Sequence, residues 1–142
     1  MRVTCRLLVS MGLCLVGCAS IDKYQASGMR HLNAGKYAQA REVYQEALGK
    51  FPESTELRLG LARVELDARR FEAAAVLAQG VLEQAPQTAA YLVLSYAHYG
   101  AGNLEEAASV ARDAVTKGMA NAPLFEHLGR LEAAAATSTR AA

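Results

Sequence analysis

GKYAQAREVYQEAL, residues 35–48, is the stretch of sequence that decides the fold. Its apolar residues are spaced by three, four and three positions, at Tyr37, Ala40, Tyr44 and Ala47. That spacing places them on one face of an α-helix, and the small side chains let a second helix approach closely. The pattern returns at Phe71, Ala74, Ala78 and Val81 after 34 residues, and at Leu104, Ala107, Ala111 and Ala114 after a further 33. A helix face that recurs at a fixed period indicates an array of similar helical units.

A second helix is predicted before each copy of this stretch. Its fourth position is occupied by Tyr24, Arg58, Tyr91 and Phe125 in successive units. Its eighth position is always small, as Gly28, Ala62, Ser95 and Gly129. Gly35 and Gly102 fall between the two helices of a unit, where a left-handed residue commonly ends the first helix. Each unit is therefore predicted to be a helix pair.

The pattern resembles the tetratricopeptide repeat (TPR), which has an aromatic residue, Leu-Gly, a turn glycine, a second aromatic residue, alanines and a closing proline. Two departures are Arg58 at the first aromatic position and Met119 where the third proline would stand. The resemblance implies an all-α fold, a TPR-type α-solenoid of three helix pairs and a C-terminal capping helix. The expected units are repeats at 21–54, 55–87 and 88–121, a capping helix at 122–136 and a disordered tail at 137–142.

The N-terminus has the pattern of an export signal. Arg2 and Arg6 form a short positive region before an apolar stretch of 11 residues, 7–17. That stretch has the length of a secretory signal core and is too short to span a bilayer. The stretch ends in LVGC, which resembles the bacterial lipobox. In that family the cysteine, here Cys18, accepts a diacylglycerol, the signal is cut before it, and the new amine is acylated.

The lipobox resemblance implies where the protein works. It divides the N-terminus into a lipoprotein signal peptide at 1–17 and a lipidated segment at 18–20. Cys5 and Cys14 would leave with the signal, so the mature chain would hold no disulfide and no cysteine metal site. The acyl chains expected on Cys18 would hold the protein stably on a membrane, because more than one chain is present. The residue directly after Cys18 is Ala19 rather than aspartate, and by the family's sorting rule we expect the outer membrane, facing the periplasm.

The remaining composition argues against other classes of function. A net charge of +1 provides no basic surface for nucleic acid. His31 and His98 recur at the eleventh position of their units, which favours a core or boundary role over catalysis. The sequence contains no recognisable metalloprotease, phosphate-loop or nucleophile motif. We expect no enzyme, no catalytic residue, no bound metal, no small-molecule substrate, and no cofactor beyond the covalent lipid on Cys18.

The TPR resemblance also implies a binding surface. In that family, positions two, five, nine, twelve and thirteen of each first helix face a concave groove. The candidates are Gln25, Met29, Asn33, Leu59, Arg63, Leu92, Tyr96, Tyr99 and Arg130. Packing between helices is an equal alternative for Leu59, Leu92 and Tyr96. A short groove of apolar anchors beside arginine favours a peptide segment or a single helix of a partner protein.

The expected function is a membrane-anchored periplasmic adaptor. Small TPR lipoproteins of this kind assist assembly of envelope complexes such as type IV or Flp pili and secretion systems. One alternative is a scaffold or regulator of cell-wall enzymes or of outer-membrane protein assembly. Another is an accessory subunit for polysaccharide export. The residues do not separate these classes.

Overall fold

The computed structural model describes residues 21–141, and all regular structure in that range is helical. The first helix covers residues 21–33. It is followed by α2 (Tyr37–Lys50), α3 (Thr55–Asp67), α4 (Phe71–Gln84), α5 (Thr88–Gly100), α6 (Leu104–Thr116) and α7 (Ala122–Ala141). The all-α prediction is confirmed. The predicted signal peptide and Cys18 lie outside the described residues.

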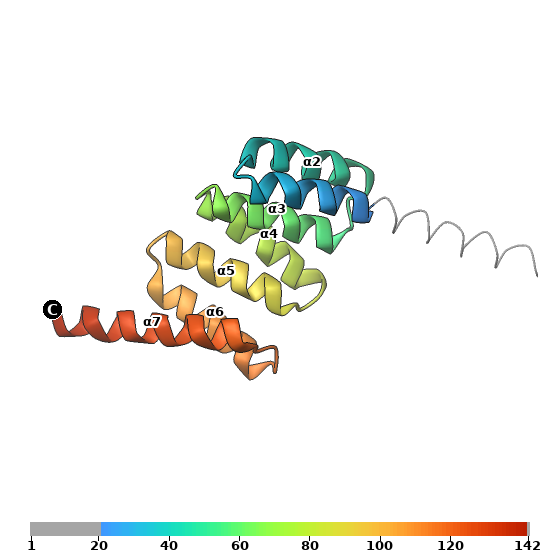
Figure 1. The fold of residues 1–142 in the computed structure, drawn as a ribbon. Coiled ribbons are helices and arrows are strands. Elements are labelled where there is room, and N and C mark those ends of the chain that lie inside the picture. The colour runs from blue at the N-terminus through green and yellow to red at the C-terminus, as the bar shows by residue number, and fades with distance from the viewer. Residues whose placement is uncertain (1–20, 142) are drawn as a thin grey trace, which may run out of the picture.

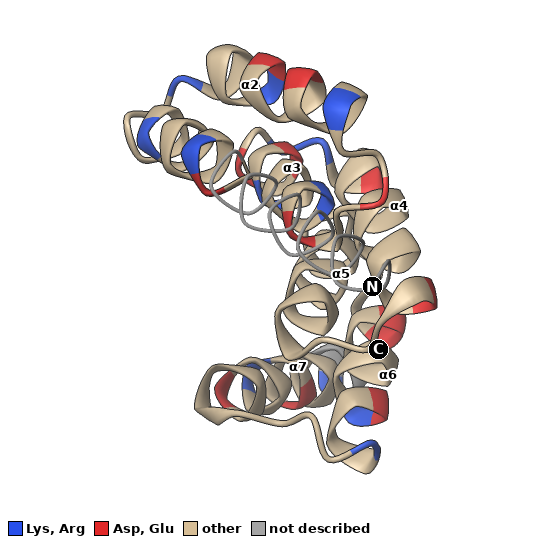
Figure 2. Ribbon diagram, turned by 90° about the vertical axis from the view of Figure 1, so that its right-hand side faces the viewer, with Lys and Arg blue, Asp and Glu red and all other residues tan. Residues whose placement is uncertain are grey.

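The helices form a curved stack in which each packs on the next (Figure 1). Figure 2 shows the curvature: α2, α4 and α6 lie along the outer side, and the first helix, α3, α5 and α7 lie along the inner side. Direct contact between α3 and α5 continues the inner layer. The described chain thus comprises three helix pairs followed by a single helix, as the sequence predicts.

A left-handed residue closes the turn inside each pair. Gly35 and Gly102 have φ angles of 69° and 88°, which confirms the prediction for the first and third pairs. The second pair uses Arg69 at the same position, with φ 60°. Glycine tolerates this conformation best, and a side chain there costs on the order of 1 kcal/mol. The third pair ends at Gly118, with φ 71°, so a glycine rather than a proline stops α6.

Small side chains set the spacing between the helices. Ala40, Ala74 and Ala107 are fully buried at the repeated contact positions, as expected for the closest approach of two helices. Tyr44 fills the space between the first helix and α3, where its ring lies against Gly28 and Gly60. The apolar core therefore runs along the stack between the inner and outer helices.

The C-terminal helix is longer than the sequence predicts. The expected disordered tail begins at residue 137, but α7 continues to Ala141. Residues 133–136 are four alanines, and no glycine or proline follows them, so nothing in the sequence ends the helix earlier. The capping helix consequently has 20 residues, whereas α3 and α5 have 13 each.

Candidate binding surface

The inner face of the stack carries most of the predicted binding residues. Asn33, Arg63, Tyr99 and Arg130 are exposed, and Gln25, Met29, Leu92 and Tyr96 are half-buried. These side chains come from all four inner helices. The sequence register therefore places a row of accessible side chains along the concave side.

One predicted binding residue belongs to the core instead. Leu59 is only 7% exposed and packs with the buried residues of α4 and α5. It lies one turn before Arg63, on the side of α3 that faces the neighbouring helices. Met29 and Leu92 are intermediate cases, since each packs against a buried cluster while keeping part of its surface accessible.

Charge is distributed unevenly along the inner face. α5 is uncoloured throughout in Figure 2 because Thr88–Gly100 contains no acidic or basic residue apart from histidine. Arg63 lies on α3, where its charge opposes the rise in the pKa of Tyr44 that burial causes. Arg130 lies on α7 and bonds Glu126 at 2.5 Å. The centre of the inner face is thus uncharged, and arginines stand on the helices to either side.

An aromatic cluster joins α5 to α7 at this centre. The rings of Tyr96 and His127 have centroids 3.9 Å apart, tilted by 34°. Tyr99 meets the same imidazole edge-on at 6.0 Å. His127 is 3% exposed, whereas Tyr99 is 49% exposed. The buried imidazole therefore packs against two tyrosines, of which Tyr99 is exposed and Tyr96 is half-buried.

A hydrogen-bond chain fixes the orientation of His127. The Ser95 hydroxyl donates to the carbonyl oxygen of Ala107 at 2.7 Å, and the Nε2 atom of His127 lies 3.0 Å from the same Ser95 oxygen. A serine hydroxyl has one proton to donate, so the neutral imidazole carries its proton on Nε2 and donates it to Ser95. These hydrogen bonds link α7 to α5 and α6.

His127 is not among the residues that the sequence singles out. It is the sixth residue of the capping unit, and Gly60 and Val93 are buried at the same position in the second and third units. Ala26, at the same position of the first unit, is exposed, so the register alone does not predict burial at residue 127. The ring partners and the bond to Ser95 depend on how α5 and α7 face each other, which a repeat pattern does not specify.

The state of His127 should make stability depend on pH. Burial lowers the pKa of its imidazole below the ordinary value; the Ser95 contact partly opposes this, and the charge of Arg130 adds to it. The folded protein therefore favours neutral histidine, and stability should fall as the pH drops below about 6.5, the ordinary histidine value. We expect the melting temperature to fall more between pH 7.5 and 5 in the wild type than in His127→Gln, which keeps a donor for Ser95. Equal losses in both proteins would contradict this role.

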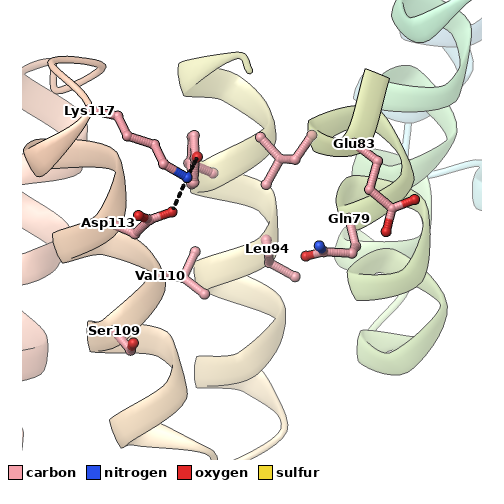
Figure 3. Close-up of a pocket in the computed structure, with 9 residues that line it drawn as sticks. Gln79, Glu83, Leu94, Ser109, Val110, Asp113 and Lys117 are labelled. Carbon is pink, nitrogen blue, oxygen red and sulfur yellow. Dashed lines mark hydrogen bonds and ion pairs between the residues drawn. The ribbon is translucent and has the colours of Figure 1, made fainter. Parts of the chain in front are cut away.

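The outer face offers a different surface. A pocket of about 320 Å³ lies between α4 and α6, with α5 as its floor (Figure 3). It is lined by Gln79, Leu82, Glu83, Tyr91, Leu94, Ser109, Val110, Asp113 and Lys117. The Lys117 ammonium donates to the Asp113 carboxylate at 2.7 Å and to the Tyr91 hydroxyl at 3.0 Å. The hydrogen-bonding groups of Lys117, Asp113 and Tyr91 are thus already paired within the chain. We therefore consider the inner face the better candidate for binding a partner.

Two family models match the chain, both described as tetratricopeptide repeat, at residues 31–95 and 77–123. The chain is built of tetratricopeptide repeats. Such repeats are typically scaffolds for protein interaction rather than enzymes. None of the curated proteins compared with the sequence matches it.

Solved TPR structures share the fold. TTC0263, a thermophilic TPR protein of Thermus thermophilus, is 26% identical with a TM-score of 0.72, over 84% of this chain and 68% of that one. The first TPR domain of human RPAP3 is 19% identical with a TM-score of 0.75, over 84% and 94%. The second RPAP3 domain, solved in complex with the HSP70 peptide SGPTIEEVD, is 18% identical with a TM-score of 0.69, over 77% and 92%.

Two further properties concern the described part of the TPR stack. Among the helices at residues 21–141, none combines the length and apolarity that a membrane crossing requires. Over the same residues, no group of three or more histidine, cysteine or acidic side chains is placed to hold a metal ion.

Proposed function

We propose that this protein is a lipid-anchored adaptor of the bacterial envelope that holds a segment of a partner protein on its inner face. The observation that carries the proposal is the uncharged α5 with its exposed tyrosine surface, placed between the arginines of α3 and α7. Aromatic residues and arginine dominate the energy of protein interfaces. This surface therefore suits a peptide or a single helix with apolar side chains and a hydrogen-bond acceptor for arginine.

Comparison with the second RPAP3 domain supports the size of the ligand. That domain has the same fold and was solved with a nine-residue peptide. The inner face described here spans four helices, and an extended peptide rises by about 3.3 Å per residue. Packed helices lie about 8–10 Å apart, so a segment of about nine extended residues would be long enough to reach from Arg63 across α5 to Arg130.

The cellular role follows from joining this surface to the N-terminal signal. The lipobox resemblance favours an outer-membrane protein that faces the periplasm. The described repeats begin at residue 21, directly after the predicted lipidated segment, so no long spacer separates the stack from the bilayer. An adaptor held close to the membrane would suit the assembly of a type IV or Flp pilus or a secretion system.

The anchor can be tested by substitution of the predicted lipid carrier. Cys18→Ser should abolish incorporation of labelled palmitate and leave a precursor that retains its signal, because the attacking thiol is gone. Cys14→Ser is the matched control, since it removes a nearby cysteine that the lipobox does not use. Equal labelling of Cys18→Ser and the wild type would contradict lipidation at this residue.

The inner face can be tested by capture of the partner from detergent-solubilised envelopes. The double variant Arg63→Ala, Tyr96→Ala should reduce capture by about tenfold or more, since interface anchors of these types often contribute more than about 1 kcal/mol each. A matched control removes the same two residue types from outer helices, as Tyr37→Ala, Arg112→Ala. Both variants must still melt cooperatively.

Each outcome of the capture experiment bears on the proposal. Loss in the inner-face variant with retention in the control supports binding at α3 and α5. Equal capture by the wild type and the inner-face variant would show that the partner does not bind at the inner face. Identification of the captured protein as a pilus or secretion component would support the assembly role, whereas a cell-wall enzyme would overturn it.

A further inference from the structure

Each first helix of a pair is covered by the second helix of the same pair. In the first unit, the Tyr24 hydroxyl donates to Glu46 of α2 at 3.0 Å. The ring of Tyr44, also from α2, occupies the notch at Gly28, where an added Cβ atom would lie 2.5 Å from the ring. The fourth and eighth positions of the first helix thus form the packing site for α2.

The third unit uses the same two positions. Its fourth residue, Tyr91, accepts a hydrogen bond from Lys117 at the end of α6. Its eighth residue, Ser95, donates to the carbonyl oxygen of Ala107 in α6. The two positions therefore contact the second helix in both the first and the third unit, although the residue types differ.

α7 presents the same packing site, and no helix of the described chain covers it. Its fourth residue is Phe125, which is 54% exposed. Its eighth is Gly129, where an added Cβ atom would meet nothing within 4 Å. The pair Phe125–Gly129 repeats the aromatic and glycine residues of Tyr24–Gly28 at the same spacing. α7 thus carries the face that holds a second helix in the first unit.

The composition of this face differs from that of an ordinary terminal cap. The last helix of a repeat stack needs a polar outer surface to remain soluble. Helical periodicity groups Phe125 and Gly129 with exposed alanines at Ala122, Ala133 and Ala136, and with Glu132, which lies near Arg112 of α6. A mostly apolar face that is exposed in this way is typical of an interaction site.

The charges on and beside this face are already paired. Glu126 bonds Arg130 on α7, and Glu132 lies 3.8 Å from Arg112 of α6. The border therefore has no excess of either sign, and a highly charged ligand would gain little from it. A helix with a mostly apolar contact face is complementary to this border.

We propose that the exposed face of α7 binds an amphipathic helix of a partner protein, which places a tyrosine or phenylalanine in the notch at Gly129 and completes a fourth repeat. The site continues the helix–helix interface that recurs along the stack, and this continuity identifies the occupant as a helix of the α2 type. It is separate from the inner face, because Arg63 and Tyr96 take no part in it.

The probe for this site is a labelled peptide of residues 36–51, which comprises α2 with one flanking residue at each end. Binding to the purified full-length protein in detergent would be followed by fluorescence anisotropy. We expect saturable binding with a dissociation constant on the order of 100 µM. Gly129→Leu should weaken it by at least about tenfold, because leucine fills the notch. The variant should still fold, since leucine favours a helix more than glycine does.

Two controls separate this site from others on the chain. Gly49→Leu is the matched variant, since Gly49 is also exposed, helical and without neighbours around an added Cβ atom. It should bind the peptide as the wild type does. A peptide with alanine in place of Tyr44 should bind at least about tenfold more weakly, because it lacks the ring for the notch.

Three results would overturn the proposal. The first is no binding up to about 1 mM peptide. The second is equal binding by Gly129→Leu and the wild type, which would mean that the peptide displaces α2 or binds elsewhere. The third is a dimer in sedimentation experiments that Gly129→Leu dissociates, which would assign the face of α7 to a second copy of the chain.

Discussion

Tyr44→Ala is expected to lower the free energy of unfolding by about 3–5 kcal/mol, the usual cost of removing a large buried aromatic side chain. Tyr44 is 1% exposed. Its ring fills the space between Gly28 of the first helix and Gly60 of α3. With alanine at this position, a cavity would remain unless the first helix and α3 moved closer together. The melting temperature should fall by roughly 10 °C.

Tyr37→Ala is the matched control for this prediction. It makes the same substitution on the same helix, but Tyr37 is 37% exposed. Partial burial should limit its cost to about 1–2 kcal/mol. Equal losses at the two tyrosines, measured by urea unfolding, would show that Tyr44 does not join the first helix to α3.

The repeat pattern is sufficient to predict the order and pairing of the helices. Period and spacing identify which side chains share a helix face, and burial of Ala74 and Ala107 follows directly from that. The turn glycines Gly35 and Gly102 are also predictable, because few other residues adopt positive φ at low cost. These features depend on residues close together in the chain, which is why sequence reasoning reaches them.

Features that depend on contacts between units are harder to predict. Arg69 adopts the left-handed conformation although no glycine marks the turn, and the Arg69 and Arg70 amides donate to the carbonyl oxygens of Leu66 and Glu65 at the end of α3. The family register places Leu59 in the groove, but its neighbours on α4 and α5 bury it. The stacking of His127 on Tyr96 requires knowing how α5 faces α7. For Leu59 and His127, the deciding partner comes from another helix.

The buried ion pair shows how far the repeat register can go. The eleventh position, which holds His31 and His98 in the first and third units, holds Glu65 in the second. The core or boundary role expected at that position also applies to Glu65, which is 5% exposed. The register does not reveal its partner, Arg41, which comes from α2 of the preceding unit and binds both carboxylate oxygens, at 2.5 and 3.0 Å.

Glu65→Leu is expected to destabilise the fold by about 3 kcal/mol, within the range for breaking a buried pair by removing one partner. The cost arises mainly from Arg41, whose side chain is 17% exposed and would be left without its carboxylate. Arg70→Ala should cost less than about 1 kcal/mol, because Arg70 is 59% exposed and lies 3.7 Å from Glu65. Urea unfolding of the three proteins would measure these differences.

The double variant Arg41→Leu, Glu65→Leu decides what the pair contributes. Desolvation of two charges offsets most of their mutual attraction, so replacing both with apolar side chains is often neutral or stabilising. We expect the double variant to lie within about 1 kcal/mol of the wild type, well above Glu65→Leu alone. A double variant as unstable as the single one would show that the pair itself stabilises the junction between the first two repeats. If the double variant is instead as stable as the wild type, the main effect of the pair is to select which helices pack at that junction. Packing α2 against any helix other than α3 would leave the Arg41 charge without its carboxylate, at a large cost in free energy.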